Sequence, residues 1–107
     1  MITTYKEPDV FHAIADKNRR KLLNLLSGDE LPVKEIATHF DISMPAVSQH
    51  LKVLLNANLV SKRTAGPLRL YQARPDALRE VHQWTSRYEK LWKRRLGKPG
   101  EYLDSKK

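Results

Sequence analysis

Cysteine is absent from the 107-residue sequence. Without it, a disulfide framework, a thiolate metal site and a thiol redox switch are all excluded. The sequence also lacks any run close to the ~18 apolar residues that a membrane-spanning helix needs. Its opening, MITTYKEPDV, has no apolar core of a secretion signal. We therefore expect a soluble protein located in the cytoplasm.

Acidic residues are scarce relative to basic ones. Lysine and arginine number 20 against 12 aspartates and glutamates, which gives a formal net charge of +8. A charge of this size favours a polyanionic partner such as nucleic acid, although ribosomal and membrane-surface proteins share it.

The sequence also lacks a plausible catalytic centre. Its four histidines, His12, His39, His50 and His82, are scattered, and packing or surface roles are expected for them. No nucleophile, base and orienting group recur at a suitable spacing, and no glycine-rich loop is available to hold phosphates. We predict that the protein is not an enzyme, and we expect it to bind neither a metal nor another cofactor.

The length of the chain is that of a single domain with one modest core. Apolar blocks recur along most of the sequence, whereas its last ten or so residues are polar and rich in lysine. We therefore predict a folded domain over residues 1–97 and a flexible tail over residues 98–107.

Helical spacing of the apolar residues dominates the sequence. It predicts helices over about residues 8–15, 17–26, 32–40, 44–57 and 76–96. Before the last helix, LVSKRT and LRLYQAR have the composition of two strands joined by a turn at AGP. The predicted fold is mainly α, with about five helices and a two-stranded hairpin.

Capping residues mark several of these helix ends. Asp16, Ser43 and Asp76 are suited to accept hydrogen bonds from free N–H groups at helix starts. Gly28 and Asn58 are suited to the left-handed conformation at helix ends, and the sequence GKP would end the last helix. Only DIS separates the third and fourth helices, which is the outline of a helix-turn-helix.

The fourth helix has two chemically different faces. At about 100° per residue, Val47, Leu51 and Leu54 share one side, which we expect to be buried. The opposite face carries polar or small residues: Pro45, Ser48, Gln49, Lys52 and Asn56.

That polar face has the chemistry to read DNA in the major groove. Gln49 can pair with adenine, Ser48 can bond a base edge, and Lys52 can reach guanine or a phosphate. Pro45 can touch a thymine methyl group, and Ser43 lies at a helix N-terminus, which suits a phosphate. The alternative is an ordinary solvated helix face.

The hairpin adds positive charge close to this helix. Lys62, Arg63 and Arg69 are predicted to lie near DNA phosphates, where they would add affinity but no sequence information. The alternative is that these charges guard the edges of strands.

The first and last helices carry more apolar and aromatic surface than a lone surface helix needs. We infer that both termini build a symmetric dimer interface, and the alternative for the aromatic residues is a small-molecule pocket. The residues predicted in the interface are Val10, Phe11, Ile14, Leu78, Val81, Trp84, Thr85, Tyr88, Leu91 and Trp92.

Three sequence blocks and the order of the elements carry a family resemblance. VFHAIADKNRRKLLNLL, VKEIATHFDISMPAVSQHLKVLLNANLV and the hairpin ending in LYQA resemble winged helix-turn-helix repressors of the ArsR/SmtB type. RYEKLWKRRL, with EYL after it, is similar to the SdpR-like branch, whose founding member is an autorepressor without a metal site. The resemblance implies base-reading positions at Met44, Pro45, Ser48 and Gln49, and a membrane receptor as antagonist.

Two departures from the family pattern concern metal sensing. Classical metal-sensing members carry two cysteines at the start of the third helix, where this sequence has Pro32 and Lys34. The family's other zinc site needs paired carboxylates and histidines on the last helix. Here His82 and Glu89 have no second histidine at ligand spacing.

Taken together, these features predict a sequence-specific transcriptional repressor that acts as a homodimer on an inverted repeat in double-stranded DNA. The resemblance implies that its targets include its own promoter. Two alternatives stay open. One is a sensor of the same fold with zinc or a small ligand at the terminal-helix interface, and the other is a winged-helix protein-interaction module.

Overall fold

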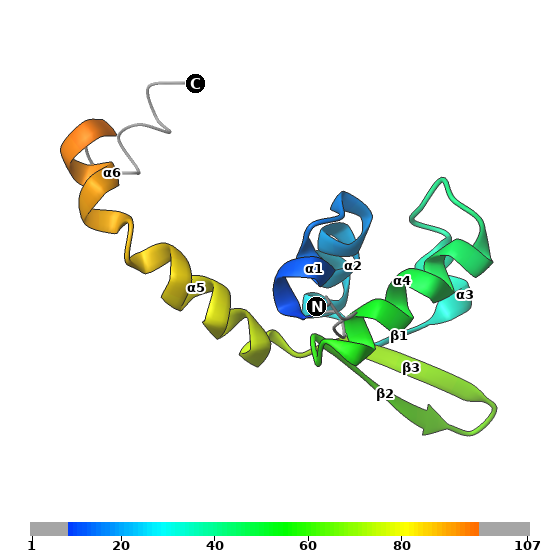
Figure 1. Cartoon of the computed structure of the whole chain (residues 1–107). Coiled ribbons are helices and arrows are strands. Elements are labelled where there is room, and N and C mark those ends of the chain that lie inside the picture. The colour runs from blue at the N-terminus through cyan, green and yellow to red at the C-terminus, as the bar shows by residue number, and fades with distance from the viewer. Residues whose placement is uncertain (1–8, 97–107) are drawn as a thin grey trace, which may run out of the picture.

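The computed structural model describes residues 9–96, which form a helical body with a small sheet and a projecting C-terminal arm (Figure 1). In chain order the elements are α1 (Val10–Ile14), α2 (Lys17–Gly28), β1 (Leu31–Pro32), α3 (Val33–Ala37), α4 (Met44–Asn56), β2 (Val60–Ala65), β3 (Leu68–Ala73), the 3-10 helix η1 (Pro75–Leu78), α5 (Arg79–Ser86) and α6 (Glu89–Leu96). This mainly helical architecture with a hairpin agrees with the predicted fold class. The predictions for residues 97–107, namely the stop at GKP and the flexible tail, lie outside the described residues.

The core lies where α1, α2, α3 and α4 meet the base of the hairpin. Burying a leucine or isoleucine side chain contributes roughly 1.5–3 kcal/mol, so this cluster holds the four helices in place. The largest fully buried side chains are Leu22, Leu26, Ile36, Val47, Leu51, Leu54 and Leu59.

Three predicted caps are confirmed. The Asp16 carboxylate accepts hydrogen bonds from two backbone N–H groups in the first turn of α2, at 2.8 and 3.1 Å. The Ser43 hydroxyl accepts one from the N–H of Ala46 at 3.2 Å, at the start of α4. Asn58 follows α4 with a φ of 62°, the left-handed conformation that ends the helix.

Two predicted helix boundaries are wrong. Gly28 is the last residue of α2 and is not left-handed. Asp29 follows it directly in an extended conformation (φ −141°, ψ 149°) toward β1. The third helix is shorter than expected, since Pro32 belongs to β1 and the helix ends at Ala37. A turn at residues 38–39 follows it.

The sheet has three strands rather than the two predicted. Leu31 pairs with Tyr71 and Pro32 with Leu70, so β1 extends the hairpin and the strand order is β1-β3-β2. A two-residue strand is too short to show an alternating pattern, so sequence periodicity could not reveal it. The predicted hairpin itself is confirmed, and Gly66 in its turn has a φ of +60°.

The long helix predicted over residues 76–96 is interrupted. Asp76 does not cap it; Asp76 lies within η1, and no side chain caps that element. The hydroxyl groups of Thr85 and Ser86 donate to carbonyl oxygens three residues earlier, at 3.1 and 2.9 Å. The N–H of Tyr88 bonds to the carbonyl oxygen of Thr85 at 3.0 Å, a tight turn that separates α5 from α6. Hydroxyl groups that bond back to a helix backbone commonly bend it.

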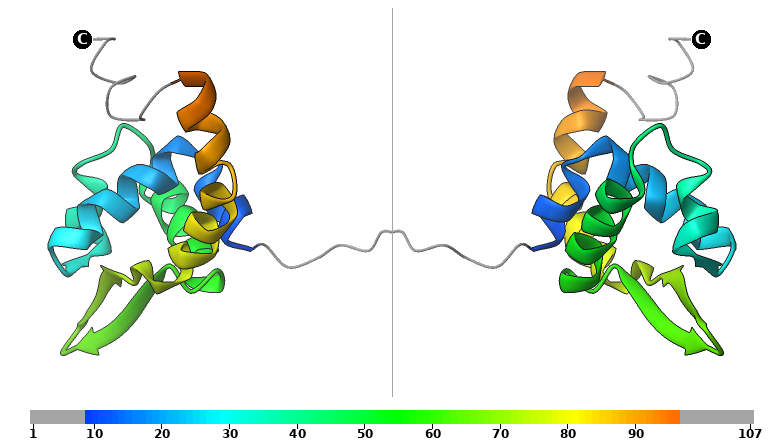
Figure 2. Two further views of the ribbon diagram at one scale, coloured as in Figure 1. Left: turned by 90° about the vertical axis from the view of Figure 1, so that its left-hand side faces the viewer. Right: turned by 90° about the vertical axis from the view of Figure 1, so that its right-hand side faces the viewer.

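We call residues 75–96, which comprise η1, α5 and α6, the terminal arm. The hairpin of β2 and β3 and the tip of this arm, α6, lie at opposite ends of the molecule (Figures 1 and 2). Among residues 9–96, no helix has the length and apolar character needed to cross a membrane.

Candidate nucleic-acid interface

The two faces predicted for α4 are present in the structure. Val47, Leu51 and Leu54 are no more than 1% exposed, so this side of the helix is anchored in the core. The opposite side is open to solvent and carries Pro45, Ser48, Gln49, Lys52 and Asn56, and Met44 is exposed at the start of the helix. The core therefore holds a rigid helix with short hydrogen-bonding groups facing outward.

The N-terminal end of α4 is also exposed. Ser43 caps it, Pro45 stands in its first turn, and Met44 keeps 43% of its surface open to solvent. A helix N-terminus carries a partial positive charge and free N–H groups, which favour an anion such as a phosphate. This end of the helix therefore offers both a phosphate contact and apolar groups for a thymine methyl.

The turn that precedes α4 is contacted by Lys21, which the sequence suggested to be part of a solvated basic face. The Lys21 ammonium donates to the carbonyl oxygen of His39 at 3.0 Å and lies 4.7 Å from the centre of the Phe40 ring. Both contacts join α2 to the turn between α3 and α4. Lys21 therefore helps to set the angle between the two helices of the helix-turn-helix.

A second missed contact ties α4 to α1 and α2. The Arg19 guanidinium donates to the carbonyl oxygens of Ala13 and His12, at 2.7 and 3.2 Å, and lies 3.1 Å from Nδ1 of His50 on α4. Because arginine only donates, Nδ1 of His50 must accept here. The only feature of the sequence that pointed to the contacts of Arg19 was the basic run NRRK after Asp16. Its partners are carbonyl groups, which no sequence pattern identifies.

Asp16 is part of the same cluster, 4.0 Å from Nε2 of His50. Desolvation tends to raise the pKa of Asp16. Hydrogen bonds from the N–H groups of Arg19 and Asn18, together with the nearby charge of Arg19, outweigh it and hold this pKa below its ordinary value of 3.8. The carboxylate therefore stays ionised at neutral pH and continues to cap α2.

The register of the hairpin divides the three predicted phosphate-binding residues between two faces. Lys62 stands opposite Tyr71 and Arg69 opposite Thr64, and directly opposed residues share one face of a sheet. Tyr71 is buried, so this face is the one turned toward the helices. Lys62 and Arg69 therefore lie on the side of the hairpin that faces α4, and Arg63 lies on the other side.

Arg63 is engaged in an ion pair. Its Nε and Nη2 atoms donate to the two carboxylate oxygens of Glu30 at 2.6 and 2.8 Å. The hydrogen bond from Arg63 holds the pKa of the Glu30 carboxyl below its usual range. Since the sheet order is β1-β3-β2, this pair spans β3 and fastens β2 to the segment before β1. The phosphate contact predicted for Arg63 would have to compete with this pair.

No metal site is evident in the part of the chain that the structure describes. Among residues 9–96, no group of three histidine, aspartate or glutamate side chains is placed to hold a metal ion. His82 and Glu89 line one small cleft of about 170 Å³ together with Thr85, Ser86 and Trp92. None of these three additional residues is a typical zinc ligand.

Most of the predicted dimer residues keep exposed surface in the single chain. Trp84, Tyr88 and Trp92 of the terminal arm are 47, 40 and 39% exposed. The Trp84 ring also contacts Phe11 of α1 edge-to-face, with ring centres 5.6 Å apart. Val10 differs from the rest, because it is only 4% exposed and thus belongs mainly to the core of one chain.

Residues 16–62 match the family described as bacterial regulatory protein, arsR family. Over 105 residues the chain is 40% identical to the HTH-type transcriptional regulator Rv2034 of Mycobacterium tuberculosis, covering 97% of this chain and 95% of that protein. Over 76 residues it is 38% identical to the transcriptional repressor SdpR of Bacillus subtilis (strain 168), covering 71% of this chain and 84% of that protein.

Solved structures share the fold. An ArsR-like transcriptional regulator from Rhodococcus sp. RHA1 superposes with a TM-score of 0.71 at 27% identity, over 90% of this chain and 88% of that one. The homodimeric winged helix-turn-helix DNA-binding domain Mb0332 from Mycobacterium bovis has a TM-score of 0.61 at 28% identity, over 74% of this chain and 76% of that one. The helices and hairpin described above therefore form a winged helix-turn-helix, in which the hairpin is the wing.

Proposed function

Because the chain belongs to the arsR family of bacterial regulatory proteins, we propose that it is a transcriptional repressor that binds operator DNA as a homodimer. The observation that carries this proposal is the exposed polar face of α4, held in place by a buried apolar face. An α-helix fits the major groove of DNA, where each base pair presents a distinct pattern of donors, acceptors and methyl groups.

Several residues on or beside that face have roles suited to their chemistry. Gln49 pairs with adenine, Ser48 bonds a base edge, and Lys52 reaches guanine or a phosphate. Pro45 and Met44 lie near thymine methyl groups. Ser43 and the free N–H groups at the start of α4 bind a phosphate.

The wing adds contacts to the DNA backbone. Lys62 and Arg69 lie on the side of the wing that faces α4, so both reach the backbone beside the groove that α4 occupies. Such contacts fix the register of the protein on DNA but carry no sequence information. Arg63 contributes indirectly, because its pair with Glu30 holds β2 in place.

Two copies related by a twofold axis would place their α4 helices about 34 Å apart, one turn of DNA. The operator is therefore an inverted repeat. A dimer bound there blocks RNA polymerase sterically. By resemblance to autorepressors, one such operator lies in the promoter of its own gene. In this proposal the protein acts in the cytoplasm and has no catalytic role. Antagonism by a membrane receptor stays a prediction that rests on family resemblance alone.

The division of the wing into two faces predicts different effects of two arginine substitutions. Arg69→Ala is expected to weaken binding to every DNA sequence and to reduce the slope of log K against log salt concentration by about 1. Arg63→Ala is expected to leave that slope unchanged, because Arg63 is paired with Glu30. Fluorescence anisotropy on operator and random duplexes, at several KCl concentrations, measures both effects.

Equal slopes for the two variants, both lower than that of the wild type, would mean that Arg63 touches a phosphate and that the assignment of wing faces is wrong. If both variants kept the salt slope and the affinity of the wild type, the wing would not be part of the DNA interface.

A further inference from the structure

We propose that His50 is a positioning residue whose neutral form is required for tight binding to an inverted-repeat operator, so that acidification weakens the binding. This inference rests on the DNA-binding homodimer of the proposed function and adds a proton to its regulation. It is carried by the contacts of one side chain, that of Arg19, which joins three helices.

Arg19 connects α1 to α4. Its guanidinium donates to the carbonyl oxygens of Ala13 and His12 in the last turn of α1, and it lies 3.1 Å from Nδ1 of His50 in α4. Because arginine has no acceptor, Nδ1 must be the unprotonated nitrogen of a neutral ring. The polar connection between α1 and α4 therefore exists only while His50 is neutral.

Protonation of His50 would place two donors against each other. A proton on Nδ1 would point at a guanidinium N–H, and two positive groups would stand 3.1 Å apart. On the other side of the ring, Nε2 lies 4.0 Å from the carboxylate of Asp16, which attracts an imidazolium. The protonated ring is therefore drawn toward Asp16 and away from Arg19, and α1 loses its polar connection to α4.

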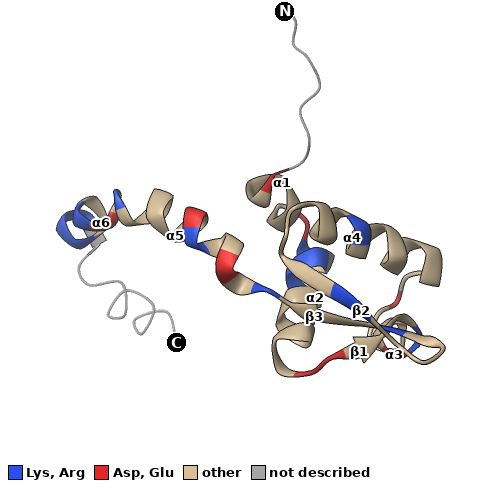
Figure 3. Ribbon diagram, turned by 90° about the horizontal axis from the view of Figure 1, so that it is seen from below, with Lys and Arg blue, Asp and Glu red and all other residues tan. Residues whose placement is uncertain are grey.

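No further charge on α4 or α2 engages the His50 ring. On α4 the one other ionisable side chain is Lys52, and Figure 3 shows a single basic position and no acidic one on this helix. Lys17, Arg20 and Lys21 of α2 are exposed, and the last two donate to backbone carbonyl groups elsewhere.

The other elements packed against α4 are α1, α3 and β2. Their ionisable side chains, with that of the residue capping α1, are Asp9, His12, Lys34, Glu35, Lys62 and Arg63. Among residues 9–96, none of them forms an ion pair or a hydrogen bond with the ring of His50. Arg19 and Asp16 therefore decide how the ring responds to a proton.

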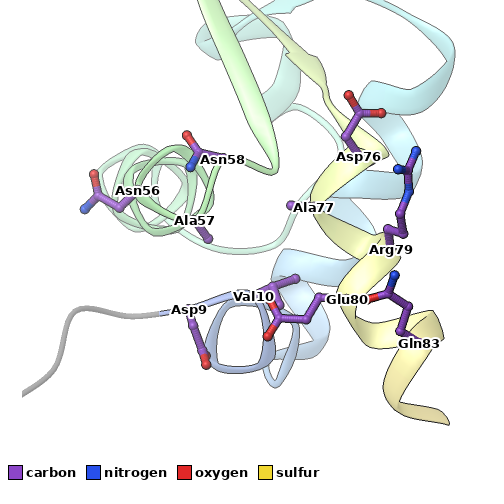
Figure 4. A pocket seen from close by; sticks show the side chains of 10 residues that line it. All are labelled: Asp9, Val10, Asn56, Ala57, Asn58, Asp76, Ala77, Arg79, Glu80 and Gln83. Atoms are coloured by element: carbon purple, nitrogen blue, oxygen red, sulfur yellow. The ribbon is translucent and has the colours of Figure 1, made fainter. Parts of the chain in front are cut away.

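The connection matters because α1 and α4 have different tasks. α4 reads the DNA, whereas α1 belongs to the predicted dimer surface, where Phe11 contacts Trp84 of the terminal arm. Figure 4 shows the end of α4 across from η1 and α5, on the other side of a cleft of about 450 Å³. The arm thus stands away from α4 at this end, and the spacing of the two α4 helices in a dimer depends on how firmly α1 holds α4.

An inverted repeat requires that spacing to be fixed. A looser connection between α1 and α4 therefore costs more affinity on an inverted repeat than on a single half-site or on random DNA. Simple attraction to phosphates responds in the opposite sense, because protonated histidines add positive charge and strengthen binding at low pH. The sign of the pH effect thus separates the two mechanisms.

The size of the effect follows from the fraction of neutral rings. An imidazole of ordinary basicity is about a tenth protonated at pH 7.5 and about nine-tenths protonated at pH 5.5. If only the neutral form is competent, the dissociation constant for the inverted repeat rises about 10-fold over this range. Fluorescence anisotropy at constant KCl measures it on three duplexes: the inverted repeat selected from a random pool, one half-site, and a random sequence.

Two histidine variants make the test specific. His50→Asn places a carbonyl oxygen close to the position of Nδ1, which accepts from Arg19 at either pH. It is expected to bind the inverted repeat like the wild type at pH 7.5 and to lose no affinity at pH 5.5. His39→Asn is the matched control, because His39 is exposed in the turn before α4. It should keep the full 10-fold loss.

Arg19→Met removes the connection at every pH. It is expected to bind the inverted repeat about 10-fold more weakly than the wild type at pH 7.5, with no further loss at pH 5.5. Circular dichroism at both pH values checks the fold, and His50→Asn carries the test alone if Arg19→Met does not fold.

A wild-type affinity for the inverted repeat that is equal at the two pH values would overturn the role of His50. So would a His50→Asn protein that loses as much affinity as the wild type. A wild-type protein with no preference for any inverted repeat at pH 7.5 would instead contradict the proposed function, so the two failures are distinguishable.

Discussion

Leu51→Ala is expected to lower the free energy of unfolding by about 2–5 kcal/mol. Leu51 is 1% exposed and lies in the middle of the buried face of α4, so its removal leaves a cavity under the helix. A domain of this size has roughly 5–15 kcal/mol of stability in total, so the loss is a large fraction of it. Urea denaturation followed by circular dichroism measures the effect.

Gln49→Ala, on the opposite face of the same helix, is the matched control. It is expected to change the free energy of unfolding by less than about 0.5 kcal/mol, because Gln49 is exposed. It should nevertheless cost about 1–3 kcal/mol of binding to the operator and relax the preference at one base position. Equal losses of binding free energy on operator and random DNA would contradict the base-reading role of Gln49. Unfolding of the Gln49→Ala protein at a clearly lower urea concentration than the wild type would contradict the assignment of the two faces.

Trp92→Ala is expected to convert the dimer into monomers. The Trp92 ring is 39% exposed, so its exposed part contributes little to the fold of a single chain. Trp84 is a less suitable test, because it also contacts Phe11 and Tyr88 of its own chain. Since a monomer engages only one half-site, operator affinity should fall by about 100-fold or more, as expected when two linked contacts are reduced to one.

Multi-angle light scattering reads the mass of the Trp92→Ala protein directly. Arg94→Ala is the control, because Arg94 lies on the opposite side of α6 and should leave the dimer intact. A Trp92→Ala protein that remains dimeric with unchanged affinity would refute the role of the terminal arm in the interface.

Features of the fold that depend on neighbouring residues were predictable from the sequence. The buried face of α4 follows from apolar spacing, and the caps at Asp16 and Ser43 follow from side chains that bond the next helical turn. Asn58 was identifiable because few residues other than glycine tolerate a left-handed backbone. In each case the determining contacts lie within a few residues.

Features that depend on distant partners were missed. Glu30 and Arg63 are 33 residues apart, and only the strand order brings them together, so no local pattern distinguishes Arg63 from Lys62 and Arg69. The contact between Arg19 and His50 spans 31 residues and likewise requires the folded arrangement of α2 and α4.

The break between α5 and α6 has a local cause, the hydroxyl groups of Thr85 and Ser86, but the apolar stripe continues across it and conceals it.

The central claim is that the Ser48 and Gln49 face of α4 enters the major groove as one of a symmetric pair. Selection of bound duplexes from a random pool, followed by footprinting of the winning sequence at low ionic strength, tests it most directly. We predict an inverted repeat whose two protected half-sites are centred about one helical turn apart. A selected pool without a dyad, or uniform protection with no preferred site, would contradict it.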